Sequence, residues 1–166
     1  MSEDRATEIL KNAILLEKRG HAFYAKVAAQ AAAGPVKDFF ALMADEETRH
    51  VQILSEQFKS YRDTKKFKPE RFEEPGFATA ARIMTEDLKN RIAAADYEAA
   101  AVSAAMSMEK NAIDIYSRRA AEAHDPDEAA LYKWLAKWEG EHLAFLSRLD
   151  REITEQIWND NSFWPF

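Results

Sequence analysis

The chain has 166 residues with only 4 glycines and 5 prolines, which suits one domain built from long helices. It contains no cysteine, so disulfides, thiolate metal sites and cysteine nucleophiles are excluded, and its net charge of −6 argues against a nucleic-acid partner. No uncharged apolar run reaches the roughly 18 residues of a membrane span, and no apolar signal segment follows the polar N-terminus. We therefore expect a cytoplasmic protein that does not enter a membrane.

The first half of the chain predicts two long helices joined by a tight turn. The first helix is expected over about residues 4–33, after a polar capping residue. Gly34 suits the position just beyond a helix end, and Pro35 suits the first turn of the next helix. The second helix is expected over about residues 35–60. The short turn makes this pair an antiparallel hairpin.

The second half repeats this plan after a long connection. The crossover is expected over residues 61–95, with a short amphipathic helix near residues 79–90 that Thr79 would cap. The third and fourth helices are expected over about residues 96–123 and 126–153, with Asp125 as the N-cap and Pro126 in the first turn of the fourth helix. An aromatic tail, residues 154–166, is expected to pack on the bundle or on a second subunit. The predicted fold is an all-α four-helix bundle made of two hairpins.

The two hairpins look like copies of one another, separated by 92 residues along the chain. The matching pairs that carry functional groups are Glu17 with Glu109, Tyr24 with Tyr116, Glu47 with Glu139, and His50 with His142. The register holds across the turn within each hairpin without a gap. A duplicated hairpin predicts a bundle with a pseudo-twofold axis, and such an axis suits a site that holds two equivalent metal ions.

Charged residues interrupt the apolar seam of each predicted helix at mid-height. Four buried carboxylates without partners would be prohibitive, whereas two divalent cations would neutralise them. The i and i+3 side chains of a Glu-x-x-His pair share one helix face, so both reach one site. We therefore predict a metal site with Glu47 and Glu139 as bridging carboxylates, Glu17 and Glu109 as terminal ligands, and His50 and His142 each on one metal.

Several neighbouring residues allow two interpretations. Tyr24 and Tyr116 lie on the faces that carry the ligands, either as core tyrosines or as donors to a carboxylate across the bundle, and we favour the second. His21 lies one turn after Glu17 and is expected at the surface or beside the site. Trp134 and Trp138 are expected to pack in the core, with electron relay as the alternative.

The arrangement resembles the rubrerythrin branch of the ferritin-like superfamily. The likeness covers residues from about 6 to 60 and 95 to 153, and it is carried by Glu17, Phe23-Tyr24 and Glu47-x-x-His50, then by Glu109, Tyr116 and Glu139-x-x-His142. It implies a ferritin-like bundle with a non-haem site of two iron ions, which reacts with hydrogen peroxide or dioxygen. Zinc or manganese are possible substitutes for iron.

Three departures from related patterns refine this expectation. A rubredoxin-like module needs four cysteines, and the chain has none. Rubrerythrins typically carry a further Glu one turn after the ligand of the third helix, where this chain has Ala112. The remaining symmetric ligand set is closer to the ferroxidase centre of bacterioferritin. The haem-binding Met of that family is replaced by Thr48, so no haem is predicted.

The leading hypothesis is a di-iron oxidoreductase that reduces peroxide or dioxygen and needs an external electron donor. One alternative is an iron-binding ferroxidase for iron storage or handling. Another is a structural bundle with a residual or zinc-filled site. In each case we expect a homodimer or a higher homo-oligomer.

Overall fold

The computed structural model describes residues 2–72, 86–93 and 96–159 of the chain. Within these ranges the protein is all-α, without a β-strand, as the sequence predicted. The described helices are α1 (Ser2–Gln30), α2 (Pro35–Thr64), α4 (Glu86–Ala93), α5 (Asp96–Glu122) and α6 (Pro126–Asn159).

The turn between α1 and α2 follows the predicted chemistry. Gly34 adopts φ 131°, a backbone conformation that favours glycine, and Pro35 begins α2. Helix α1 ends at Gln30, a few residues before the expected end. Helix α2 continues past the expected Ser60 to Thr64. It ends where Lys65 adopts φ 59° and donates its backbone N–H to the Tyr61 carbonyl.

Helix α6 begins at Pro126, as predicted, but is longer than expected. The Asp125 carboxylate accepts a 2.8 Å hydrogen bond from the backbone N–H of Asp127, so Asp125 caps α6 ahead of Pro126. Helix α6 ends at Asn159, so residues 154–159 of the expected tail are helical. The remaining residues of that tail lie outside the described part of the chain.

The crossover contains a short helix where the sequence predicted one. The described part, α4 (Glu86–Ala93), extends a few residues past the expected end near residue 90, and the first part of the predicted helix, Thr79 included, lies outside the described residues. Helix α4 packs against α2, α5 and α6. Among the described helices, none is both long and apolar enough to cross a membrane.

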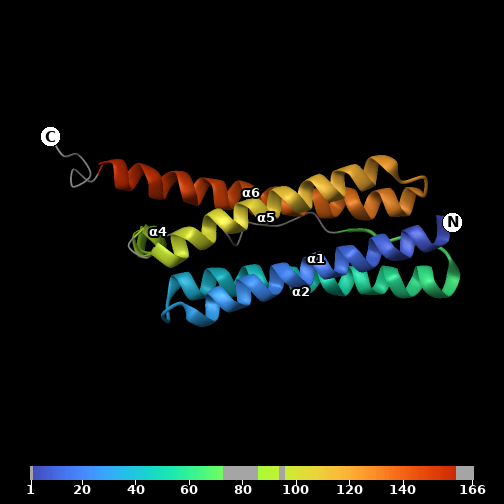
Figure 1. Ribbon diagram of the computed structural model, residues 1–166, viewed down its shortest axis with the longest axis horizontal. Helices are drawn as coiled ribbons and strands as arrows, with labels where there is room; N and C mark the ends of the chain where they lie inside the picture. Colours follow the sequence, from blue (N-terminus) through green and yellow to red (C-terminus); the bar gives the residue numbers. More distant parts are fainter. Residues whose placement is uncertain (1, 73–85, 94–95, 160–166) are drawn as a thin grey trace.

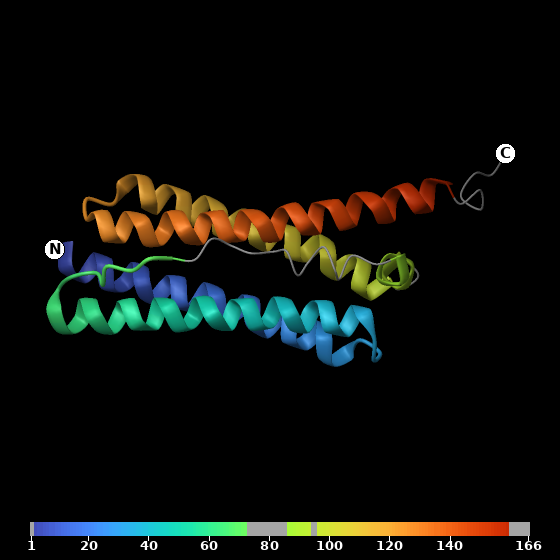
Figure 2. The ribbon, with the colours of Figure 1, turned by 180° about the vertical axis from the view of Figure 1, so that it is seen from behind.

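The two hairpins lie side by side, with α1 beside α2 and α5 beside α6 (Figure 1). Helices α1 and α5 also contact one another between the hairpins. After α2, residues 65–72 run back between the two hairpins, as the view from behind shows (Figure 2). This returning segment is anchored by Phe67, which is buried, and by Phe72, whose ring stacks on Trp134.

The apolar core is divided into two clusters along the length of the bundle. One cluster contains Tyr24, Phe40 and Met43 with residues from the later part of α6. The other contains Leu10, Leu54 and Tyr116 with residues from the earlier part of α6, and the order of these residues along each helix places the charged layer between the two clusters. Such a layer needs compensation, because burial strongly disfavours unpaired charges.

Candidate metal centre

The structure brings all six predicted ligands into this layer, one or two from each long helix. All six side chains are almost completely buried, with at most 4 % of any residue exposed. They are Glu17 on α1, Glu47 and His50 on α2, Glu109 on α5, and Glu139 and His142 on α6. Helical periodicity explains the convergence, because each Glu-x-x-His pair presents both side chains on one helix face.

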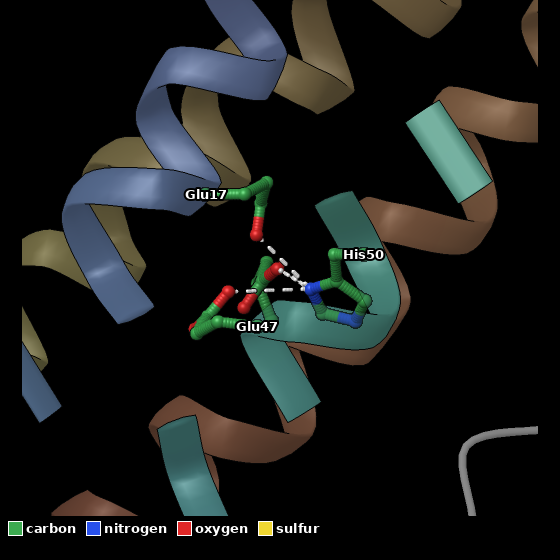
Figure 3. A group of neighbouring side chains, drawn as sticks. Glu17, Glu47 and His50 are labelled. Carbon is green, nitrogen blue, oxygen red and sulfur yellow. Dashed lines mark hydrogen bonds and ion pairs between the residues drawn. The ribbon is translucent and has the colours of Figure 1, made fainter. Parts of the chain in front are cut away.

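Glu17, Glu47, His50 and Glu139 form the first group, whose candidate ligand atoms all lie within 4.8 Å of one another. Nδ1 of His50 lies 3.1 Å from Oε2 of Glu17 and 2.9 Å from Oε1 of Glu139. The same nitrogen lies 3.4 Å from Oε2 of Glu47. In Figure 3 the side chains of Glu17, Glu47 and His50 point toward a common centre between α1 and α2.

Glu47, Glu109, Glu139 and His142 form the second group, with the same spacing between candidate ligand atoms. Nδ1 of His142 lies 3.1 Å from Oε2 of Glu139 and 3.5 Å from Oε1 of Glu109. It also lies 3.9 Å from Oε1 of Glu47. Glu47 and Glu139 therefore belong to both groups, and each turns one oxygen toward His50 and the other toward His142.

The pKa values of these residues indicate how charge is distributed over the cluster in the metal-free protein. Burial, followed by the neighbouring carboxylates, raises the pKa of Glu47 well above its ordinary value. Burial and Glu139 raise the pKa of Glu109 to about 7. Burial would also raise the pKa of Glu139, but His50 and His142 hold it well below its usual range. Crowding in the buried layer therefore favours the protonated form of Glu47 and Glu109, and the imidazoles favour the ionised form of Glu139.

Both imidazoles are biased toward the protonated form. Burial lowers the pKa of His50, but the carboxylates around it, led by Glu139, raise it well above its ordinary value. Burial also lowers the pKa of His142, but the neighbouring carboxylates of Glu109 and Glu139 outweigh it and raise the pKa to about 10. In the metal-free protein, protons on the imidazoles and on some of the carboxylates partly neutralise the negative charge of the cluster. In a loaded site, two metal ions would take over this role.

Two buried tyrosines connect the hairpins through this layer. The hydroxyl of Tyr24 on α1 donates a 2.5 Å hydrogen bond to Oε1 of Glu109 on α5. The hydroxyl of Tyr116 on α5 donates to Oε1 of Glu17 on α1. Burial and these carboxylates raise both tyrosine pKa values, so the hydroxyls remain donors. The hydrogen bonds across the bundle that the sequence suggested are thus present.

Helix α1 comes close to Glu47 at Gly20, a contact that the sequence analysis did not anticipate. A Cβ atom at this position would lie 3.3 Å from the carboxyl carbon of Glu47, which is tighter than most real Cβ contacts. The equivalent residue in the repeat is Ala112. Glycine at position 20 therefore leaves room for the Glu47 carboxylate in its present place.

Aromatic side chains pack against the imidazole of His50. The His50 ring makes edge contacts with Trp134 and Trp138, each with centroids 5.6 Å apart. Both indoles are buried, as the packing interpretation expected. Nε2 of His50 is buried and has no hydrogen-bond partner among the described residues, so the outward edge of this ring meets apolar surroundings.

His21 does not join the charged cluster. Its ring is only partly buried, and Nδ1 lies 3.0 Å from the Ala44 carbonyl oxygen and 3.0 Å from Oγ1 of Thr48. Thr48 also donates a 3.1 Å hydrogen bond to the Ala44 carbonyl. These contacts hold His21 against α2 beside the site rather than within it.

A helical bundle with carboxylates and imidazoles gathered in its core belongs to the ferritin-like class. Comparison with known families assigns the chain within that class. The rubrerythrin family model matches residues 8–150, and the chain therefore belongs to the rubrerythrin family. Comparisons with curated proteins and with solved structures found no match.

Proposed function

We propose that this protein is a non-haem di-iron oxidoreductase that reduces hydrogen peroxide or dioxygen as Fe(II) is oxidised. The observation that carries the proposal is the sharing of Glu47 and Glu139 between two four-residue groups. A single-metal site does not need two shared carboxylates that each present opposite oxygens to two imidazoles. Membership of the rubrerythrin family supports the same assignment.

The donor set fits a pair of divalent metal ions. Carboxylate and imidazole donors suit iron, manganese and zinc, and four carboxylates balance the charge of two such ions. Both oxygens of Glu139 are buried and lack a hydrogen bond of good geometry among the described residues, although each faces an imidazole nitrogen. With metal ions in place of the imidazole protons, these oxygens and the facing imidazole nitrogens would be well placed to share a cation.

In the proposed site, Glu17 and His50 would hold one ion, and Glu109 and His142 would hold the other. Glu47 and Glu139 belong to both groups and would contribute to holding each ion. Tyr24 and Tyr116 keep the terminal carboxylates oriented, since each tyrosine donates a hydrogen bond from the opposite hairpin. The pKa of Glu109 near 7 means that this carboxyl gives up its proton when it binds a metal near neutral pH.

Two bound ferrous ions would supply the two electrons that convert peroxide, with two protons, into two water molecules. The protein's part is to hold the carboxylates between two apolar clusters and to keep bulk water away from them. The chain contains no cysteine, so it holds no rubredoxin-type iron to return electrons to the site. The proposal therefore includes an external electron donor.

Rapid mixing of the di-ferrous protein with one equivalent of peroxide tests this function. We expect oxidation within one turnover, seen as new ferric absorption, and no further turnover until a reductant is added. His50→Ala and His142→Ala should slow the oxidation much more than Tyr24→Phe, because the first two remove a ligand and the third removes an orienting hydrogen bond. A metal-loaded protein that ignores both peroxide and dioxygen would contradict the proposal.

A further inference from the structure

The proposed metal centre has two sides of different character. On the side of α2 and α6, the His50 ring is covered by Trp134 and Trp138, and Phe72 stacks on Trp134. Between α1 and α5, a cavity of about 20 Å³ reaches the carboxylates of Glu17, Glu47, Glu109 and Glu139. A small molecule that reaches the metals between α1 and α5 therefore meets the carboxylates directly.

Four small or apolar residues frame this cavity. Leu16 and Gly20 come from α1, and Met108 and Ala112 come from α5. Each α5 residue follows its α1 counterpart by the same 92 residues that separate Glu17 from Glu109. The residues that frame the cavity are therefore equivalent positions of the two repeats, and the cavity lies where α1 and α5 face one another.

Among the residues that line this cavity, Leu16 and Met108 are the two that also reach the surface. Both side chains are partly exposed, whereas the adjacent Glu17 and Glu109 are each only 3 % exposed. Leu16 also lines a second, larger cavity of about 460 Å³, whose walls come mainly from α1 and α5. One side chain thus forms part of the wall of both spaces.

Size and polarity limit what can pass between these spaces. A volume of about 20 Å³ is only slightly above the roughly 10–15 Å³ that one water molecule requires. Leu16 and Met108 carry no hydrogen-bond donor, so they offer nothing to a bulky polar substrate. Hydrogen peroxide and dioxygen are small enough for this space, whereas an alkyl hydroperoxide is not.

We propose that Leu16 and Met108 form a size gate over the metal centre, which restricts its substrates to dioxygen and hydrogen peroxide and excludes organic hydroperoxides. This inference rests on the proposed function, because it concerns access to the same centre. Truncation of either gate residue should admit larger molecules without a change in the ligands.

A binding experiment without redox chemistry tests the gate. The protein is loaded with Co(II), whose visible spectrum reports its coordination, and is titrated with azide and with benzoate, two anions of equal charge and different size. Wild type should bind azide and bind benzoate much more weakly. Leu16→Ala and Met108→Ala should each raise the benzoate affinity by about tenfold or more, and leave the azide affinity within about threefold. Leu15→Ala is the matched control, because Leu15 is 50 % exposed and does not line the inner cavity.

A parallel kinetic experiment uses the di-ferrous protein with hydrogen peroxide or tert-butyl hydroperoxide. Only the two gate variants should gain about tenfold in their rate with the alkyl hydroperoxide. The gate is refuted if wild type already accepts benzoate and tert-butyl hydroperoxide as readily as the small molecules, or if both gate variants behave like Leu15→Ala. Size-selective binding to the Co(II) protein, together with no reaction of the di-ferrous protein, would support the gate and contradict the oxidoreductase function.

Discussion

Tyr24 on α1 donates a 2.5 Å hydrogen bond to Glu109 on α5, and so joins the two hairpins at the level of the charged layer. The repeat produces the reverse contact, in which Tyr116 on α5 donates to Glu17 on α1. Each hairpin therefore orients a terminal carboxylate that belongs to the other. In the proposed centre, the geometry at each metal depends on the correct pairing of both hairpins.

The first prediction concerns these tyrosines. Tyr24→Phe and Tyr116→Phe should each weaken metal binding by about tenfold or more, because a carboxylate ligand loses its orienting donor. Competition with a chromophoric chelator measures the affinity. Tyr97→Phe is the control, since Tyr97 is 49 % exposed. Unchanged affinity in both core variants would show that the hydrogen bonds serve folding alone.

The second prediction separates the two shared carboxylates in the metal-free protein. Burial and like charges raise the pKa of Glu47, so Glu47→Gln should raise the free energy of unfolding near pH 8 by roughly 1 kcal/mol or more. The imidazoles instead favour the ionised form of Glu139, so Glu139→Gln should lower that free energy by about 3 kcal/mol. Denaturant titration measures both changes. Equal effects of the two substitutions would contradict the assigned charge distribution.

The third prediction is a pH dependence. The pKa of Glu109 is raised to about 7 in the folded protein, above the ordinary carboxyl pKa of 4.5. This group therefore stabilises the fold at low pH, and that stabilisation is lost as the pH rises from 4.5 through 7. The pKa of His142 is raised to about 10, so its contribution is complete below its ordinary value of 6.5 and is lost as the pH rises through 10. Glu139 acts in the opposite sense, since its lowered pKa stabilises the fold above 4.5 and this contribution is lost as the pH falls further.

Metal binding displaces the protons on Glu109 and on the imidazoles. Metal affinity should therefore increase as the pH rises, because fewer protons then compete for these ligands. The rise in melting temperature on addition of Zn(II) should therefore be larger at about pH 8 than at about pH 5.5. Calorimetry of the metal-free and loaded protein at both pH values measures it. A gain that is constant or shrinks with pH would argue against protonated ligands in the metal-free cluster.

The fourth prediction uses Gly20, where a Cβ atom would lie 3.3 Å from the Glu47 carboxyl carbon. Gly20→Ala should weaken metal binding because the carboxylate must shift, even though alanine favours the helix by about 1 kcal/mol. Ala112→Gly is the matched control in the repeat, and it should cost about 1 kcal/mol of stability with little effect on metal affinity. Parallel measurements of affinity and unfolding separate the two effects. Unaltered metal affinity in Gly20→Ala would mean that the close contact does not position Glu47.

The sequence predicted the parts of the structure that depend on local chemistry and helical period. Pro35 and Pro126 marked the starts of α2 and α6, and the 3.6-residue period placed the six charged residues in one layer. Helix ends were harder to predict. Helix α6 continues to Asn159 because no Gly or Pro interrupts residues 154–159. Within this stretch, the Thr154 hydroxyl donates a hydrogen bond to the Asp150 carbonyl.

Contacts that depend on the distance between helices could not be predicted from the sequence. The approach of Gly20 to Glu47 depends on how closely α1 packs on α2, and no pattern along the chain reports that distance. The placement of Trp134 and Trp138 against His50 also follows from packing rather than from the repeat. The equivalent positions in the first repeat, 92 residues earlier, hold Leu42 and Glu46 instead of tryptophan.

A crystal structure of the iron-loaded protein, with anomalous scattering recorded at the iron absorption edge, would locate the metal ions themselves. We expect two anomalous peaks in each chain, one beside Glu17 and His50 and the other beside Glu109 and His142. The carboxylates of Glu47 and Glu139 should lie between the peaks and contact both. One peak alone, or peaks outside this layer, would contradict the di-metal centre.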